Sequence, residues 1–305
     1  MTVSMTDERK ERVNKTIGAI LLPSMLILML VHGEGLRRAV TDGALLALST
    51  VLPSVFPFMV FGDAIASMQV RLGRFCSRFG RIFGIPDAAV GAVVCGNVLG
   101  FPLGARGVSR MLVDDAELSV RCAALATSPS AAFIISGVGA GILRDMRLGL
   151  VLYAIMLVST AITAVIFRKK RDFSSVSCDN TEQSFSLSES ITSAGGASIT
   201  ILSSISFFSG MAFIVRETLG NRVALLVSPL LEVSGGVSML ARAELPTMLR
   251  LTLISFALGF SGICAAVQCS PYLPRGGGLR RFLLIKLVVG TVSAMISLPV
   301  FYLFY

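Results

Sequence analysis

The chain alternates long apolar blocks with short polar or charged connections. Seven blocks are nearly free of charge, and they cover residues 17–31, 43–62, 88–105, 148–167, 191–215, 251–269 and 282–305. A helix rises about 1.5 Å per residue, so a block of about 17–25 residues matches the hydrocarbon core of a bilayer. The pattern predicts an all-α polytopic membrane protein with roughly seven to nine spanning or partly spanning helices.

Helix-breaking residues interrupt one of these blocks. In VLGFPLGARGVSRML (98–112), Gly100, Pro102 and Gly104 follow one another at every second position, and Arg106 comes directly after them. Such residues release backbone groups from helical hydrogen bonds. In a membrane, released groups are tolerated only inside protein or beside a water-filled cavity. We therefore expect an interrupted helix near a cavity at this place.

The two halves of the chain resemble each other. VLPSVFPFMVFGDAI (51–65) aligns with ILSSISFFSGMAFIV (201–215), and VLGFPLGA (98–105) aligns with ALGFSGIC (257–264) in the same order. One such match could arise by chance, but two in the same order indicate an internal duplication.

Charges beside the repeated segments give their orientation. The helix predicted at 43–66 runs toward a basic stretch at 71–81, whereas its copy at 191–215 starts after the basic residues 168–171. Because cytoplasmic loops carry an excess of Lys and Arg, the two copies should cross the bilayer in opposite directions. Inverted repeats with interrupted helices are typical of secondary transporters, whose sites lie near the midplane. The predicted fold is thus an inverted-repeat, transporter-like bundle.

These features divide the chain into four parts. They are a cytoplasmic N-terminal segment with a first membrane anchor (1–40), a first repeat (41–167), a cytoplasmic linker that opens with RKKR (168–190) and a second repeat (191–305). The first apolar block resembles a secretory signal, but no small-residue cleavage site follows it, so we interpret it as an uncleaved anchor. Residues 71–84 predict a basic amphipathic helix on the cytoplasmic membrane surface.

Composition agrees with a membrane protein. The chain is 54% hydrophobic and 15% charged, whereas soluble domains carry about a quarter charged residues. The formal net charge of +9 fits the positive-inside bias, since the basic residues lie between apolar blocks, and we expect no nucleic-acid partner. The six cysteines form no Cys-x-x-Cys pair, so we predict buried thiols, no metal site and no cofactor.

Four segments carry a resemblance to a known family. PSVFPFMVFG (53–62), GFPLGARGVSRML (100–112), ATSPSAAFIISGVGAGIL (126–143) and LGFSGICAAVQ (258–268) resemble the sporulation integral membrane protein family of the YlbJ type. The resemblance implies a Gate, or nucleoside-recognition, domain in the two repeats, of the kind shared with nucleoside transporters and iron permeases. It also implies a role in making the spore cortex, in the forespore or mother-cell membrane of an endospore-forming bacterium.

Polar and helix-breaking residues inside the apolar blocks are the candidate site, because a polar group at membrane depth is costly unless it is paired or wet. The candidates for substrate binding are Asn97, Gly100, Pro102, Gly104, Arg106, Ser128, Ser130, Glu232, Ser261, Gly262 and Gln268.

Several candidates have an alternative structural interpretation. Arg106 either faces a cavity or is an anchor that reaches the interface. Asn97 and Gln268 either bind a solute or form hydrogen bonds between helices. Glu232, before a Gly-Gly pair, is a proton site, a cation site or the ion-pair partner of an arginine.

Enzyme signatures are missing from the sequence: it has one histidine and no Gly-x-Ser-x-Gly elbow, phosphate loop or His-Glu-x-x-His. We therefore expect no enzyme. The leading hypothesis is a transporter or gate for a small solute, nucleoside-like or of another class. The alternative is a non-transporting scaffold that organises partners for cortex or envelope assembly. Both have the lipid bilayer as a partner, and both leave a homo-oligomer open.

Overall fold

The computed structural model describes residue 19 and residues 23–67, 73–112, 115–168 and 186–304. These residues form helices joined by short turns, and no strand occurs among them. The chain is therefore an all-α polytopic membrane protein, because five of its helical segments are long and apolar enough to cross a bilayer. These segments are Gly33–Phe61, Met146–Ile166, Leu187–Leu219, Thr247–Tyr272 and Gly278–Leu303.

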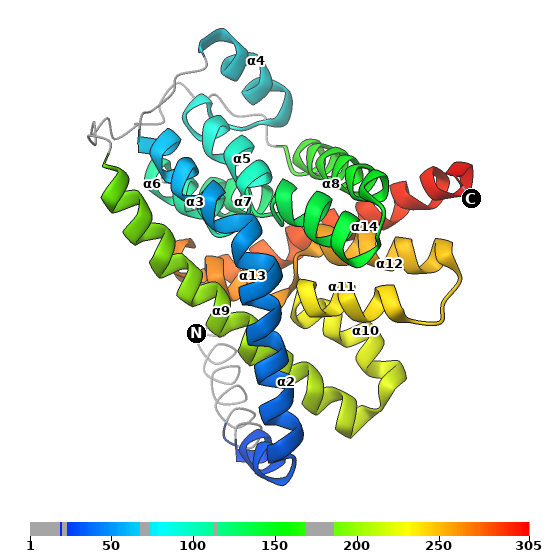
Figure 1. Ribbon diagram of the computed structural model, residues 1–305. Coiled ribbons are helices and arrows are strands. Elements are labelled where there is room, and N and C mark those ends of the chain that lie inside the picture. Colours follow the sequence, from blue (N-terminus) through cyan, green and yellow to red (C-terminus); the bar gives the residue numbers. More distant parts are fainter. Residues whose placement is uncertain (1–18, 20–22, 68–72, 113–114, 169–185, 305) are drawn as a thin grey trace, which may run out of the picture.

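Most of the predicted blocks became helices at the expected places. Blocks 148–167, 191–215 and 282–305 correspond to α8 (Met146–Ile166), α9 (Leu187–Leu219) and α14 (Gly278–Phe304). The block at 43–62 lies in a longer helical run made of α2 (Gly33–Leu46), η1 (Ala47–Val51) and α3 (Leu52–Ser67). In Figure 1 this run, coloured blue, lies beside α9, and the two pack against each other.

The block at 88–105 does not form one spanning helix. It divides into α5 (Asp87–Leu99) and the first turn of α6 (Leu103–Met111), which fold back on each other as a hairpin. Gly100, with φ +93°, and Pro102 lie at its tip. A second hairpin consists of α10 (Asn221–Leu231) and α11 (Val233–Arg242), with Glu232 at its tip. Neither arm of either hairpin is long enough to span a bilayer.

Two further helical segments are interrupted within their length. The run α7 (Ala116–Leu125) to η2 (Phe133–Ile142) is broken at residues 126–130, which read ATSPS. The run α12 (Thr247–Phe260) to α13 (Gly262–Cys269) is broken at Ser261, which has the left-handed φ of +69°. A short 3₁₀ turn, η3 (Ser270–Tyr272), follows α13.

The order of the elements repeats along the described chain. A long helical run (α2–α3 or α9) comes first, then a hairpin (α5–α6 or α10–α11), an interrupted helix (α7–η2 or α12–α13) and a long helix (α8 or α14). Segments 51–65 and 201–215, which match in sequence, both belong to the long helical run that comes first in this order. The match of 98–105 with 257–264 instead joins a hairpin tip to an interrupted helix.

Three predicted segments reach the edge of the described residues. Of the first block (17–31), residues 23–31 are helical, and most of its beginning lies outside the described part. The linker 168–190 also lies mostly outside, but α9 already begins at Leu187, where Ser186 accepts a hydrogen bond from the Glu189 amide. The amphipathic helix is α4 (Gly73–Phe83), and its Arg78 and Arg81 are exposed.

Candidate functional site

Both hairpin tips and both helix breaks meet at one small cavity. About 30 Å³ of it is open to the centre of a water molecule, which is room for about two waters. Its lining comes from helices of both halves of the chain and from the turns between them: Val51, Val55, Gly100, Phe101, Pro129, Ser130, Phe133, Ile201, Ile205, Glu232, Val233, Ser234, Ser261, Cys264, Ala265 and Gln268. Five of the eleven candidates lie in this lining, although they are far apart in the sequence.

The first hairpin tip packs on the first helix break. The amide of Phe101 donates to the carbonyl of Ser128 over 3.0 Å. A Cβ on Gly100 would lie only 3.0 Å from atoms of Ser130, so a glycine is required for this approach as well as for its positive φ. The Ser130 hydroxyl accepts from the amide of Phe133 and so begins the next helical segment. The tip and the break thus form one wall of the cavity.

The second hairpin tip packs on the second helix break in a similar way. A Cβ on Gly262, which has φ +79°, would lie 3.3 Å from the carbonyl oxygen of Leu231 and from the amide of Val233. Glu232 is 3% exposed. Its two carboxylate oxygens accept from the amides of Ser234 and Gly235 at 2.6 Å, so the side chain caps the start of α11. Glu232 forms no ion pair with any described residue.

Gln268 brings an amide group without a full set of partners to the cavity. The side chain is 4% exposed, and its Nε2 donates to Cys264 Sγ at 3.3 Å. Its Oε1 has no hydrogen-bond partner among the described residues. A buried amide oxygen of this kind usually has a partner, and an unsatisfied one costs about 1–3 kcal/mol. This oxygen is therefore an unsatisfied acceptor within the packed wall of the cavity.

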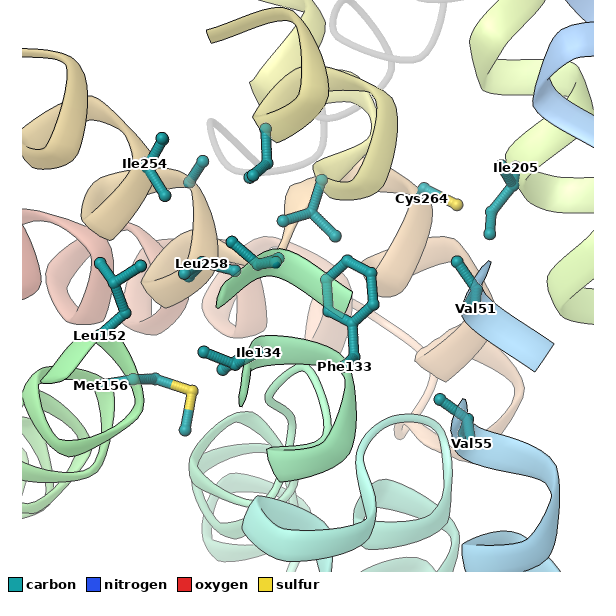
Figure 2. Packing of buried hydrophobic residues seen from close by; sticks show 14 of the residues in the cluster. Val51, Val55, Phe133, Ile134, Leu152, Met156, Ile205, Ile254, Leu258 and Cys264 are labelled. Atoms are coloured by element: carbon teal, nitrogen blue, oxygen red, sulfur yellow. The ribbon is translucent and has the colours of Figure 1, made fainter. Parts of the chain in front are cut away.

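The remaining wall of the cavity is apolar. Figure 2 shows Phe133, Cys264, Ile205, Val51 and Val55 in one part of the hydrophobic cluster, each on a different element, and all five line the cavity. η1 and η2, which carry Val51 and Phe133, are π-helical. Such segments are rare and occur frequently at functional sites. The site therefore combines an apolar wall with a few buried polar groups, as binding pockets usually do.

Six candidates lie outside the cavity. Arg106 was expected either at a cavity or at the membrane interface, and it does not line this cavity. Its Nη1 instead donates to Ser193 Oγ on α9 at 2.5 Å. Asn97 forms the predicted kind of interhelical bond, since its Nδ2 donates to the Leu125 carbonyl at 2.8 Å. The carbonyl of Ser128 accepts a hydrogen bond from Phe101, and it thereby holds a residue of the cavity lining in place. Gly262 does so through its contact with the Glu232 tip.

Gly104 and Pro102, the other two outside candidates, have structural roles. Pro102 precedes the first residue of α6. A Cβ on Gly104 would collide with the carbonyl oxygen of Ala126, and a Cβ on Gly96 would collide with the same atom. These two glycines let α5, α6 and the end of α7 approach closely. Gly104 therefore acts in packing and does not line the cavity.

A buried lysine near this site was not among the candidates. Lys286, on α14, is 1% exposed, and its Nζ donates to the carbonyl of Thr127 in the first helix break. It forms no ion pair with any described residue. The signal was present in the sequence, because GLRRFLLIKLVVG places one lysine inside an apolar span, where ionisable residues are rare.

A buried arginine was also missed, and it ties three segments together. Arg121, on α7, donates through Nη1 to the carbonyl of Phe167 at the end of α8. Its Nη2 donates to the carbonyl of Gly84 after α4. Helix ends leave carbonyls without partners, and this guanidinium satisfies two of them at once. Its role is structural.

The chemistry available at the cavity is hydrogen bonding and charge. No group of three or more His, Cys, Asp or Glu residues that could hold a metal ion occurs among the described residues. The polar residues of its lining are Glu232, Gln268 and three serines, and its described lining includes no basic side chain. The arrangement suits a solute that has an apolar surface and a few hydrogen-bonding groups.

Comparison of the chain with models of protein families, with curated proteins and with solved structures finds no match.

Proposed function

We propose that this protein is a carrier or gate for a small solute in a membrane of spore formation. The observation that carries the proposal is the meeting of two hairpin tips and two helix breaks at one buried cavity. Non-helical backbone at membrane depth is costly unless it lines a cavity or is buried in protein, and transporters place such breaks at their binding sites. The resemblance to the YlbJ-type family is the reason for the link to spores.

The cavity is small for a solute of nucleoside size. Pockets that hold drug-sized ligands measure about 300–1,000 Å³, whereas this cavity measures about 30 Å³. A larger solute would require the two halves of the site to separate. In transporters built from inverted repeats, one repeat rocks against the other around such a site. In this proposal the structure corresponds to the closed arrangement, with the hairpin tips resting on the helix breaks.

Loss of the protein should change the distribution of one solute between the forespore and the mother cell. The measurement is metabolite profiling of the two separated compartments in a deletion strain and in strains complemented with variants. Gln268→Leu removes the only side-chain amide among the residues that line the cavity. We expect the variant protein to be folded, and we expect its strain to show the same change in metabolite profile as the deletion strain.

The matched control for that experiment is Gly91→Ala in α5, because a Cβ at this helical position meets nothing within 4 Å. Gly91→Ala should restore the wild-type profile. If Gln268→Leu also restores it, together with normal spores, the cavity is not a transport site. The scaffold alternative would then be the better account, since a scaffold does not need polar groups in a cavity.

The orientation in the membrane can be tested with a native cysteine. Cys178 lies in the linker 168–190, outside the described residues, and RKKR before it predicts a cytoplasmic location. With the other cysteines replaced, an impermeant thiol reagent should label Cys178 in inside-out vesicles and leave it unlabelled in intact cells. Strong labelling in intact cells would reverse the proposed orientation of both repeats.

A further inference from the structure

We infer that the junction of α4 with the end of α8 binds anionic phospholipids of the bilayer through Arg78 and Arg168. The inference goes beyond the proposed function, because such a surface would serve a carrier and a scaffold alike. It is carried by three observations on the described residues. The apolar side of α4 is already covered by protein, two exposed arginines have no charged partner, and both lie near the ends of spanning helices.

The apolar side of α4 packs on the protein and is not free to enter lipid. The rings of Phe79 and Phe83 have centroids 4.6 Å apart, and both pack against a buried cluster that includes α5, α6 and α7. A Cβ on Gly80 would collide with the carbonyl oxygen of Ile85, so this side of α4 is in close contact with the chain that follows it. Of the α4 side chains that the structure describes, Ile82 is the one large apolar side chain that is exposed. Apolar insertion is therefore a minor contribution, and the charged side of α4 is what remains for the bilayer.

Two arginines at the α4–α8 junction are exposed. Arg78 lies on the side of α4 opposite its packed side, and Arg168 follows the end of α8. Neither side chain forms an ion pair or a hydrogen bond with any described residue. The stem of Arg168 packs along Gly84, because a Cβ on that glycine would lie 2.9 Å from Arg168 Cγ. Arg121 joins the two elements, since it donates to the carbonyls of Gly84 and Phe167.

The junction lies where spanning helices end. α8 is long and apolar enough to cross a bilayer, and Arg168 comes two residues after its last residue, Ile166. α3, which continues the first spanning segment, ends at Ser67, shortly before α4 begins. Figure 1 shows α4 at the edge of the molecule, where it contacts α5 and α8. Lipid phosphates lie at this level, and a guanidinium can bind a phosphate through two N–H groups at once.

The charge of the lipid follows from the missing partners. A zwitterionic lipid carries its own ammonium group beside the phosphate, whereas an anionic lipid has a net negative charge to offer to two unpaired arginines. Arginines at the start of α2 and at the end of α9 differ, because they have carboxylates beside them. Glu34 pairs with Arg37 and Arg38, and Glu217 pairs with Arg216. These paired arginines provide the reference for the experiment.

Tryptophan fluorescence can measure which lipid lies beside α4, because the chain contains no tryptophan. The full-length protein with Ile82→Trp is placed in liposomes of phosphatidylcholine with brominated phosphatidylglycerol or brominated phosphatidylcholine. Bromine quenches tryptophan at short range, so the quenching gives the binding constant of one lipid relative to the other. An arginine near an anionic headgroup strengthens binding about fivefold, so two should give about a 25-fold preference for phosphatidylglycerol at low salt.

A second reporter and two sets of variants locate the lipid. Leu45→Trp, at an exposed position of α2 about two turns after the paired Arg38, should show no such preference. Arg78→Gln together with Arg168→Gln should remove the preference at the α4 reporter, whereas Arg37→Gln should leave it unchanged. Glutamine keeps the Cγ that packs on Gly84, and these arginines are exposed, so the melting temperatures of the variants should match that of the wild type.

Salt tests the inference without a further variant. The Debye length falls from about 10 Å at 0.1 M salt to about 3 Å at 1 M, so most of the preference should be lost at 1 M. Equal quenching by the two lipids at the α4 reporter would overturn the inference. A preference that persists at 1 M salt or in the double variant would also overturn it, because apolar insertion or another site would then hold the lipid. Equal quenching together with binding of polyglutamate to the wild type alone would assign the arginines to an acidic protein partner instead.

Discussion

Lys286→Met should leave the protein folded in the membrane but reduce its function by about 5- to 150-fold. Methionine is apolar and similar in length, so the variant avoids the cost of burying an ammonium group in an apolar span. What is lost is the donor to the Thr127 carbonyl at the first helix break. An unsatisfied buried carbonyl costs about 1–3 kcal/mol. A cost of this size lowers the population of the correctly assembled helix break by about 5- to 150-fold.

The measurement combines abundance and function. Membrane abundance and size-exclusion profile of a fluorescent fusion report folding, and complementation of the deletion strain reports function. The matched control is Arg281→Met, which removes an exposed positive charge from the same helix and should be neutral. Wild-type function in Lys286→Met would show that the lysine only fills space. Loss of protein from the membrane would show that it is a brace of the fold.

Gly104→Ala should strongly lower the amount of folded protein. The new Cβ would collide with the carbonyl oxygen of Ala126 and come within 2.8 Å of the Gly96 Cα. Both are backbone atoms, so no side-chain rotation can relieve the collision. Overpacking of this kind costs about 1–3 kcal/mol and occasionally more. The collision also separates α6 from the end of α7, so the first hairpin tip moves away from the cavity.

Thermal stability in detergent is the measurement for this variant. Gly91→Ala, in the other arm of the same hairpin, is the control, since its Cβ meets nothing within 4 Å and alanine favours helix. We expect the control to melt at the wild-type temperature or slightly above it. A Gly104→Ala protein with the same melting temperature as Gly91→Ala would contradict the close packing of α5, α6 and α7.

The interrupted helices show how far local chemistry predicts this fold. Gly100 and Pro102 indicated a break, and a break occurs there, because glycine and proline act within one or two residues of their own position. The sequence pattern did not show that the break at 98–105 turns the chain back into a hairpin. Whether a break kinks a helix or reverses it depends on the partners of the released groups, such as the Ser128 carbonyl bound by Phe101.

The candidate site was predicted in part for the same reason. Glu232 and Gln268 could be selected because a polar group inside an apolar block is costly, and each lies at the cavity. Arg106 satisfied the same criterion and instead contacts Ser193 on α9. Its distance from Glu232 depends on which helices are neighbours, and hydrophobic periodicity carries no information on that. Lys286 satisfied the criterion as well and could have been chosen.

The sequence by itself determined the membrane class, the positions of the long helices and the places where helices break. Each of these follows from residues next to one another, through apolar length in the case of α8 or α14 and through backbone restriction at Gly100 and Pro102. Only the tertiary structure decided that residues about 170 apart, such as Gly100 and Gln268, line one cavity. The physical reason is that close approach depends on packing between whole helices, as at Gly104 and the Ala126 carbonyl, and such contacts join segments that are distant in the chain.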